Sequence, residues 1–404
     1  MSVEIRSIAA EELAALLVAD ERGFGSGPTA PAVATTWAAD ELDRTRVAFA
    51  GGRIVGVSRA YSLELTLPGG ARLPTAGVAS CSVLPTHRRR GLLAAMLAAL
   101  HDDARARAEP IAALTASEPT IYGRFGYGPA AWRLACSIDR ADLTLRADAP
   151  DGGGSLRMLD PDEIERVLPP LYDGIRRATP GAVSRPASWW AAGPTGFHAA
   201  RPGLTVVVHA DADGRDDAYV SYAVGGEWNG GSARRRVLVA DLQAATPAAR
   251  LACWRYLGGI DAAGIVSVAA APVDDPIRHA LVDPRRLRID SLVDGLWCRP
   301  LDPARVLAAR RYGAGGSLVI EMADPDGTRS VLALDGGPDG AECRATTAVP
   351  DLRTDAATLG AALLGGTRWS ELVAAGRATG DPDVVRRADA MFSWWPAPAM
   401  LSTF

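Results

Sequence analysis

The chain has 404 residues, which corresponds to two or three domains of ordinary size, and 48% of them are hydrophobic, enough to fill several buried cores. Its net charge of −4 argues against a general nucleic-acid-binding protein, which would carry a basic excess. All 43 basic residues are arginine, so a Schiff-base lysine and a Walker A loop are excluded.

Cysteine and histidine are scarce and scattered. The five cysteines form no CxxC pair and the five histidines show no HExxH spacing, so we expect no metal site. No stretch approaches 18 apolar residues, and the first residues lack an apolar signal core. We therefore expect a cytoplasmic protein without membrane partners.

The first third of the chain alternates between predicted strands and helices. A helix is predicted from Arg6 to Leu17, with Ser7 as its N-cap. A second, longer helix is predicted over residues 91–108, where apolar residues recur every three or four positions. The predicted strands occupy residues 46–67, around a Gly-Gly turn, and residues 72–84, 110–117 and 132–145.

The central region repeats this order. A glycine-rich linker at residues 148–155 precedes a predicted helix at 159–177. Then come a hairpin, a strand, a helix and a strand, at residues 203–228, 234–246, 247–260 and 265–271. This order of elements predicts a second copy of the first architecture.

The pattern changes from about residue 293. A helix at Pro303–Arg311 leads into a predicted antiparallel meander with Asp-Gly turns at 315–347, and short helices come after it. The final segment, SWWPAPAMLSTF, is strongly apolar, whereas most termini are polar and frayed. It therefore predicts a buried end of the chain.

The stretch SCSVLPTHRRRGLLAAM, residues 80–96, is the most informative. After a predicted strand come Arg88, Arg89 and Arg90, and a long apolar helix begins directly after Gly91. The N–H groups and the dipole at such a helix start favour an anion, and a glycine allows close approach of the backbone. The pattern suits a pyrophosphate, and a solvated basic turn before an ordinary helix is the equal alternative.

A second informative stretch is SEPTIYGRFGYGPA, residues 117–130. A strand runs into a helix fragment that holds Tyr122, followed by a YxxxGY turn. A tyrosine hydroxyl, with an ordinary pKa of about 10, can donate a proton to a leaving thiolate within hydrogen-bond reach. Packing with a satisfied hydroxyl is the commoner role of a single tyrosine, so both roles stay open at this point.

Together the two stretches resemble GNAT-fold acetyltransferases, whose signature is a strand, R/Q-x-x-G-x-G/A at a helix start, and a tyrosine in Y-x-x-x-G-F/Y. Arg88, Gly91 and Tyr122 match this signature, and Leu93 replaces the usual small residue. The strings LTLPGGARLPTAGV, PTHRRRGLL, IYGRFGYGPA and DGLW and a C-terminal phenylalanine resemble the enhanced-intracellular-survival (Eis) N-acetyltransferases along the whole chain.

This resemblance implies an α+β fold with tandem GNAT domains, the second of them degenerate, and a sterol-carrier-protein-like domain. The implied domains are a catalytic GNAT domain at residues 1–147, a GNAT-like domain at 148–292 and the sterol-carrier-like domain at 293–404. The central domain has no R-x-x-G-x loop after its strand, so we do not expect it to bind CoA in the usual way. The family also implies a homohexamer.

The resemblance makes acetyl-CoA the co-substrate and assigns residues to it. The backbone N–H groups of Cys81, Ser82 and Val83 would pair with the pantetheine arm and polarise the thioester carbonyl. Ser117 and Glu118, on the next strand, would flank the cofactor. The pyrophosphate would be held by Arg88, Arg89, Arg90, Gly91, Leu92, Leu93 and Ala94.

The resemblance also assigns the proton transfers. Tyr122 would protonate the departing CoA thiolate, and the C-terminal carboxylate of Phe404 would be the proton acceptor. A free α-carboxyl has a pKa of about 3.3–3.7, weak for deprotonating an ammonium, so either burial raises this pKa or a water relays the proton. Cys81 is a candidate nucleophile, but no histidine or acid lies near it in the sequence, and we favour direct transfer in a ternary complex.

The acceptor is expected to be a small-molecule amine. Aromatic and acidic side chains suit a cationic ligand, and the candidates are Asp20, Glu21 and Phe24 in a loop after the first predicted helix, with Trp37 and Trp190. A core position is an equal alternative for each tryptophan.

Two departures bear on the acceptor class. Aminoglycoside-acting relatives tend to place an acid beside the terminal phenylalanine, where this chain has Thr403, and Phe24 falls where an acidic loop residue is expected. A less acidic pocket would hold a polycationic drug less well. Aminoglycosides are the first hypothesis, lysine side chains or another cationic amine the second, and a ligand-binding protein with a vestigial GNAT site the third.

Overall fold

A computed structural model of the protein describes residues 3–25, 41–191, 204–226, 228–229, 232–233, 235–261 and 263–404. The chain divides into two compact units. Unit 1 consists of Met1–Ala130, Leu296–Trp394 and Phe404, and unit 2 of Ala131–Gly295 and Trp395–Thr403. The sequences of the first and third expected domains thus share unit 1.

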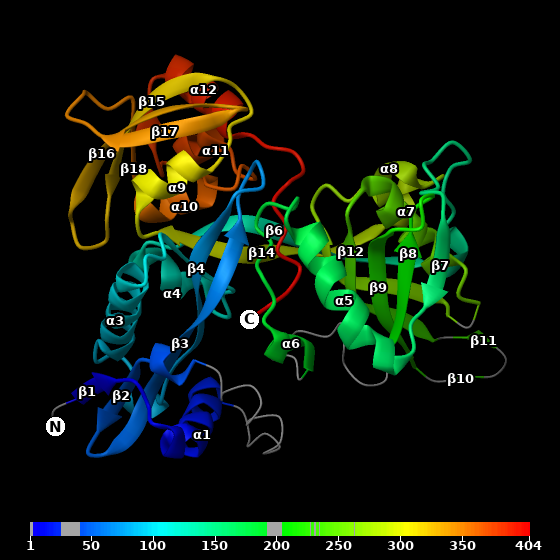
Figure 1. The fold of residues 1–404 in the computed structure, drawn as a ribbon, viewed down its shortest axis with the longest axis horizontal. Coiled ribbons are helices and arrows are strands. Elements are labelled where there is room, and N and C mark those ends of the chain that lie inside the picture. The colour runs from blue at the N-terminus through cyan, green and yellow to red at the C-terminus, as the bar shows by residue number, and fades with distance from the viewer. Residues whose placement is uncertain are drawn as a thin grey trace. The chain divides into compact units, whose positions relative to one another are not determined.

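The N-terminal part of unit 1 is built on a sheet with the strand order β1-β2-β3-β4-β5-β14 (Figure 1). Its neighbours are antiparallel except β4 and β5, which are parallel. The predicted Gly-Gly turn is confirmed, because Gly51 and Gly52 both have positive φ between β2 and β3. The strands are β1 (Val3–Arg6), β2 (Val47–Ala50), β3 (Arg53–Thr66), β4 (Arg72–Val83), β5 (Ile111–Leu114) and β14 (Arg288–Pro300).

The predicted first helix is displaced. Arg6 ends strand β1, which pairs with β2, and helix α1 runs over Leu13–Phe24 after a short 3-10 turn, η1 (Ala10–Glu12). Ser7 is not a cap, because its hydroxyl donates to carbonyls of the segment before β2. Asp20, Glu21 and Phe24 consequently lie within α1 and not in a loop after it.

The predicted second helix is confirmed as α3 (Leu92–Ala106), which lies beside β3 and β4 (Figure 1). Its buried side chains follow the 3.6-residue period and include Met96, Leu97 and Leu100. The helix fragment predicted around Tyr122 is also present, as α4 (Pro119–Tyr122).

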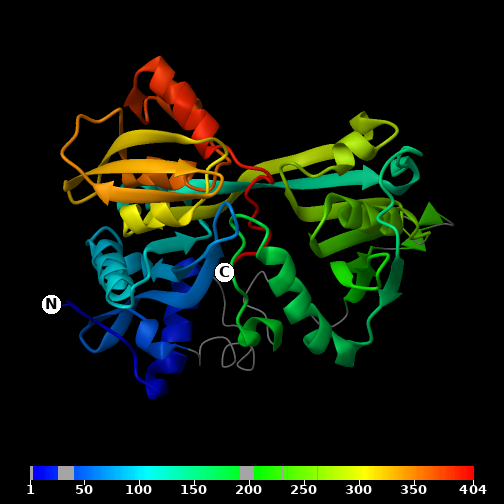
Figure 2. The same ribbon diagram turned by 45° about the horizontal axis from the view of Figure 1, so that its top comes forward.

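The C-terminal part of unit 1 has its own sheet, in the order β17-β16-β15-β18-β19. The predicted meander is confirmed in β15–β17, whose strands lie side by side (Figure 2). The strands are β15 (Gly316–Ala323), β16 (Arg329–Gly337), β17 (Gly340–Ala345), β18 (Leu352–Asp355) and β19 (Thr379–Gly380). The helices are α9 (Pro303–Ala309), α10 (Ala356–Ala362), α11 (Trp369–Ala374) and α12 (Pro382–Phe392).

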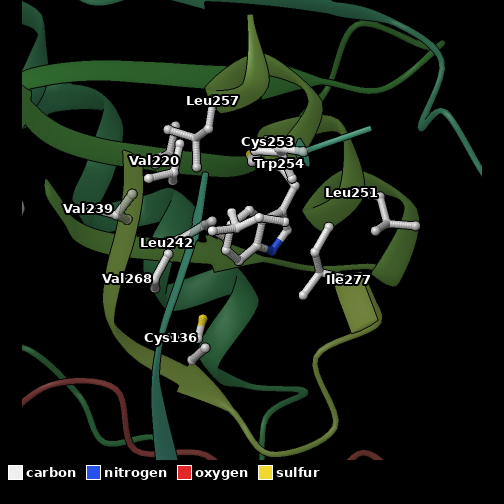
Figure 3. Close-up of a cluster of buried hydrophobic side chains, with 14 of the residues drawn as sticks. Cys136, Val220, Val239, Leu242, Leu251, Cys253, Trp254, Leu257, Val268 and Ile277 are labelled. Carbon is white, nitrogen blue, oxygen red and sulfur yellow. The ribbon is translucent and has the colours of Figure 1, made fainter. Parts of the chain in front are cut away.

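Unit 2 contains a sheet with the order β6-β13-β12-β9-β8-β7, whose core packs around the buried indole of Trp254 (Figure 3). The strands are β6 (Gly128–Asp139), which enters from unit 1, β7 (Ser155–Met158), β8 (Thr205–Ala210), β9 (Asp216–Gly225), β12 (Arg236–Ala244) and β13 (Ile265–Pro272). Two short strands, β10 (Trp228–Asn229) and β11 (Ser232–Ala233), pair separately. The helices are α5 (Pro161–Arg176), α6 (Ala187–Ala191), α7 (Pro247–Gly258) and α8 (Ile277–Ala280).

The predicted internal repeat is confirmed. Elements β8, β9, β12, α7 and β13 come in the same order as β2, β3, β4, α3 and β5. In both sets the strand before the long helix is parallel to the strand after it. The first and central regions therefore share one architecture.

The predicted buried chain end is confirmed only in part. Ala399, Met400 and Ser402 are buried, whereas Trp395 is exposed and Phe404 is half-buried. Within the part of the chain that the structure describes, no helix is long and apolar enough to cross a membrane.

Candidate functional site

The loop between β4 and α3, residues 84–91, is shaped to receive an anion. Arg89 (φ 60°) and Gly91 (φ 77°) occupy the left-handed region, where glycine fits without strain. No side chain of the described residues caps the N-terminus of α3, and a Cβ on Gly91 would meet nothing within 4 Å. The start of α3 thus has no side-chain cap, and the space beside Gly91 is open, an arrangement that suits a pyrophosphate.

The three arginines of the loop are exposed, and two of them hydrogen-bond to backbone carbonyls. The Arg88 guanidinium donates to the carbonyls of Gly23, at 2.8 Å, and Val83, at 3.2 Å. The Arg90 guanidinium donates to the carbonyl of Thr86 at 3.1 Å. Arg88 therefore holds the loop against α1 and the end of β4, in addition to placing its charge beside the helix start.

Strand β4 carries a β-bulge that the sequence did not indicate. Ser80 and Cys81 together stand opposite Ser58 of β3, and Ser80 has a left-handed φ of 51°. Bulges of this kind redirect side chains and often lie beside active sites. This bulge falls on the strand end whose N–H groups, at residues 81–83, are predicted to hold the thioester.

Strands β4 and β5 separate at the same end. They pair only over Thr75–Gly77 and Ile111–Ala113, whereas β4 continues to Val83. The prediction that Ser117 and Glu118 lie on the second strand is wrong, because β5 ends at Leu114 and both residues are exposed beyond it. The strand ends therefore diverge beyond Gly77 and Ala113, as the resemblance predicts for the place of the pantetheine arm.

Phe404 lies where these strands separate. The Thr115 hydroxyl, one residue after β5, donates to a backbone oxygen of Phe404 at 2.8 Å, and the Phe404 N–H donates back to it at 3.4 Å. A Cβ on Gly77 would lie 3.4 Å from Cε2 of the Phe404 ring, so the ring rests against β4. The structure therefore places Phe404 beside Gly77 of β4 and Thr115, the residue after β5.

Tyr122 is buried at the end of α4 and shares a hydrogen bond with Cys81. Burial, and then Cys81, raise the pKa of Tyr122 above its ordinary value of 10.0. Burial, and then the charge of Asp20, raise the pKa of the Cys81 thiol to about 12. Both groups hold their protons at neutral pH, so Cys81 is a poor nucleophile. Tyr122 is in the protonated form that a donor needs, although the raised pKa also makes its hydroxyl a weaker acid.

A buried polar chain that no sequence pattern indicated supports Tyr122. The ring of Tyr127 lies edge-on to Tyr122 with centroids 6.1 Å apart, and its hydroxyl is 2.8 Å from Nε2 of His101. Arg299 donates to Nδ1 of His101 at 2.9 Å and to Asp324 at 2.7 Å. Burial, and then Arg299, lower the pKa of His101 to about 3, so the ring is neutral and its Nε2–H donates to Tyr127.

Asp20, one of the predicted acceptor-pocket residues, is buried on α1. The Ser82 hydroxyl of β4 donates to its Oδ1 at 2.8 Å. Burial raises the pKa of Asp20 to about 6, although hydrogen bonds from Ser82 and Ser80 and the charge of Arg59 lower it. A carboxyl group that titrates near neutrality thus lies beside the predicted thioester-binding strand.

The other predicted acceptor-binding residues are dispersed over the two units. Phe24 is half-exposed at the end of α1, and Trp37 lies outside the described residues. Trp190 and Thr403 belong to unit 2. Trp190 is buried with its ring 5.9 Å from that of Tyr172, the packing of a core residue. The roles of these four residues stay predictions.

The residues that the structure describes include no cluster of three or more His, Cys, Asp or Glu side chains that could hold a metal ion. The chemistry that the described side chains offer is acid–base chemistry around the strand end of β4.

Comparisons with known proteins agree with this architecture. Family models described as acetyltransferase (GNAT) domain match residues 4–130 and 181–305, and a sterol carrier protein domain matches residues 303–401. A Streptomyces griseus protein named an uncharacterized N-acetyltransferase is 37% identical over 391 residues, which cover 94% of each chain.

Two relatives carry a more specific name. N-acetyltransferase Eis of Mycobacterium tuberculosis is 37% identical over 353 residues, 85% of this chain and 84% of that protein. The crystal structure of Eis1 from Mycobacterium abscessus aligns with a TM-score of 0.87 at 33% identity, over 99% of this chain and 100% of that one. The chain therefore belongs to the Eis family of GNAT N-acetyltransferases and is an acetyltransferase with two GNAT domains and a C-terminal sterol-carrier-protein domain.

Proposed function

We propose that the protein transfers the acetyl group of acetyl-CoA directly to a primary amine, in a ternary complex, within a catalytic domain of residues 1–147. Acetyl-CoA supplies the activated thioester. The start of α3 binds its pyrophosphate, and the N–H groups of residues 81–83 polarise the thioester carbonyl. Tyr122 gives its proton to the sulfur as the C–S bond breaks, and the carboxylate of Phe404 accepts a proton from the nitrogen.

The observation that carries this proposal is the convergence of three groups in unit 1. The Tyr122 hydroxyl is hydrogen-bonded to Cys81 on the bulged strand β4. The Thr115 hydroxyl, just after β5, donates a hydrogen bond to the Phe404 backbone oxygen. These two hydrogen bonds support the proposal that a donor and an acceptor flank the thioester. The raised pKa of the Cys81 thiol supports direct transfer over an acetyl-cysteine route.

For the acceptor we propose cationic amines, with aminoglycosides acetylated at one or more positions as the first class. Two acids on α1, Asp20 and Glu21, supply negative charge close to the strand end. Lysine side chains of proteins and other cationic amines are the second class, because the sequence has Thr403 and Phe24 where acids are expected in aminoglycoside-acting relatives.

We also propose a homohexamer in the cytoplasm, with domain boundaries near residues 147 and 292. The first half of β14 exposes Ile289, Leu292 and Val293, which a neighbouring subunit would cover. The five cysteines are free thiols, which suits a reducing compartment. Light scattering of the purified chain tests the assembly, and a monomeric mass would contradict it.

The test of the chemistry is a CoA thiol-release assay across aminoglycosides, lysine peptides and small amines. We expect release by the wild type, and a fall in kcat of roughly a hundredfold or more for Tyr122→Phe and for a chain extended beyond Phe404, since general acid–base groups contribute about 10²–10⁴-fold. Tyr256→Phe is the matched control, because it removes a hydroxyl that pairs with Tyr222 in unit 2. Unchanged turnover in Tyr122→Phe or in the extended chain would contradict the corresponding role.

A further inference from the structure

Acetylation of an ammonium group needs two proton acceptors and one donor. The nitrogen loses two protons on the way from ammonium to amide, and the sulfur of the leaving thiol gains one. In the proposed function, Tyr122 is the donor and the Phe404 carboxylate is one acceptor. A second group must take the proton that masks the nitrogen lone pair before the attack.

Asp20 is placed to be that group. Its carboxylate accepts a hydrogen bond of 2.8 Å from Ser82, and the neighbouring Cys81 is hydrogen-bonded to Tyr122. Ser80 and Ser82 both hydrogen-bond Asp20, whereas Cys81 between them hydrogen-bonds Tyr122, so Asp20 and Tyr122 contact opposite faces of this part of β4. An amine that attacks the thioester from the α1 face thus meets a carboxylate, and the leaving sulfur meets a hydroxyl on the other face.

The surroundings of Asp20 leave it able to exchange a proton at neutral pH. The charged and titratable groups that act on it are Arg59 from β3, Cys81 from β4 and Glu21 from α1 itself. On the adjoining turn η1, Glu12 is paired with Arg6. Burial raises the pKa of Asp20 to about 6, so the group is ionised at pH 7 and yet binds a proton roughly a hundredfold more tightly than an ordinary aspartate.

We propose that Asp20 is a catalytic residue that removes the first proton from the acceptor ammonium, an inference that rests on the proposed acetyl transfer. The N–H bond breaks as an O–H bond forms on Asp20, and the freed lone pair attacks the carbonyl carbon. The C–N bond forms and the C–S bond breaks, with the Tyr122 proton passing to sulfur. The second nitrogen proton goes to the Phe404 carboxylate, and exchange with water restores Tyr122 and both carboxylates.

The test is the pH dependence of kcat/KM for wild type and Asp20→Asn. Wild-type activity should fall as the pH drops through about 6, since the protonated carboxyl cannot accept a proton. Asp20→Asn should lose this limb and about a hundredfold in kcat at pH 7. Its activity should recover as the pH approaches the pKa of the acceptor amine, which then arrives unprotonated. The extended chain, which removes the other acceptor, should not recover in this way.

Two further variants separate a chemical role from a structural one. Ser82→Ala removes a hydrogen bond that lowers the pKa of Asp20, so the acid limb should move to higher pH even if Asp20→Asn folds poorly. Glu11→Gln removes an exposed carboxylate near the start of α1 and should leave the profile unchanged.

The outcomes distinguish the two proposals. An active wild type with the same acid limb in Asp20→Asn, or an unmoved limb in Ser82→Ala, would overturn the role of Asp20 and leave acetyl transfer standing. A wild type that releases no thiol with any amine would overturn both.

Discussion

The two GNAT-type domains of this chain carry the same bulged strand and use it differently. β4 bulges at Ser80 and Cys81, and β12 bulges between Val239 and Asp241, each just before the strand reaches its long helix. Beyond the bulge, β4 enters an eight-residue loop, 84–91, that leads to an uncapped helix start. The first and central copies therefore differ more in the connection from strand to helix than in the strand itself.

In the central domain the helix start is closed. Only Ala245 and Thr246 separate β12 from α7, and the Thr246 side chain accepts the Ala249 N–H at 3.1 Å. Pro247, the first residue of the helix, has no N–H to offer. A cap and a proline thus occupy the place where the first domain presents free N–H groups to an anion.

Both domains also bury an aspartate beside the bulge. Asp20 is held by serine hydroxyls, whereas Asp241 accepts from Arg185 at 2.9 Å and from Tyr219 at 2.7 Å. Arg185 also donates to Ser402, and so ties the segment before the C-terminus to unit 2. A guanidinium turns the central carboxylate into a structural ion pair, whereas neutral hydroxyl donors leave the carboxylate of Asp20 able to take up a proton.

The largest expected effect tests the ion pair. Asp241→Asn leaves the Arg185 charge buried without its carboxylate, and we expect the free energy of unfolding to fall by about 3–5 kcal/mol. Replacing both, Arg185→Met with Asp241→Leu, should recover much of that loss because no buried charge remains. Urea unfolding of the full chain measures both, and the Kd for acetyl-CoA should not change. A single variant as stable as the wild type would show that the pair is not structural.

Asp20→Asn, in the first domain, should raise the free energy of unfolding at pH 7.5, whereas Asp241→Asn lowers it. Burial raises the pKa of Asp20 from 3.8 to about 6, so the folded state binds the proton more tightly than the unfolded state. Stability is then fully present below pH 4 and falls as the pH rises through 6, by about 3 kcal/mol in total. Asp20→Asn should lack this decline, and so be more stable than the wild type at pH 7.5 but not at pH 4.

Urea midpoints at several pH values measure this difference, with Glu11→Gln as the exposed control. If the urea midpoints of wild type and Asp20→Asn changed in parallel with pH, burial would not raise the pKa of Asp20. Opposite signs for Asp20→Asn and Asp241→Asn at pH 7.5 would instead establish the contrast between the two domains.

Local signals in the sequence predicted much of this fold. The period of residues 91–108 located α3, Gly51 and Gly52 located the first hairpin turn, and the order of elements revealed the internal repeat. The helix and the turn are each decided within a short stretch of chain, and the repeat follows from the order of such local elements. The residue patterns singled out the loop and Tyr122, and the resemblance assigned their roles and that of Phe404. The structure adds the hydrogen bond between Tyr122 and Cys81 and the contact of Phe404 with β4 at Gly77.

The features that were missed depend on contacts distant in sequence. β1 forms because it pairs with β2 about forty residues later, and this pairing moves the start of the first helix to Leu13. The bulge at Ser80 carries no glycine to mark it. The network of His101 and Arg299 joins side chains 198 positions apart. The burial of Asp20 likewise results from the packing of α1 on β4, which no local pattern reports.

The smallest expected effect concerns the two helix starts. Gly91→Asp places a carboxylate at the N-terminus of α3, which the helix dipole favours, while the left-handed backbone opposes it by a similar amount. The free energy of unfolding should therefore change by less than about 1 kcal/mol. The Kd for acetyl-CoA should rise about tenfold, or 1.4 kcal/mol, because the new charge faces the pyrophosphate. Gly91→Asn, of the same shape without the charge, should weaken binding less.

Thr246→Ala is the counterpart in the central domain. It removes the cap of α7 and should lower the free energy of unfolding by about 1 kcal/mol, since N-cap losses are typically of that size. Because that helix start is closed by Thr246 and Pro247, the Kd for acetyl-CoA measured by calorimetry should be unchanged. If Thr246→Ala weakened acetyl-CoA binding, or Gly91→Asp did not, the assignment of the anion site to the first domain would be wrong.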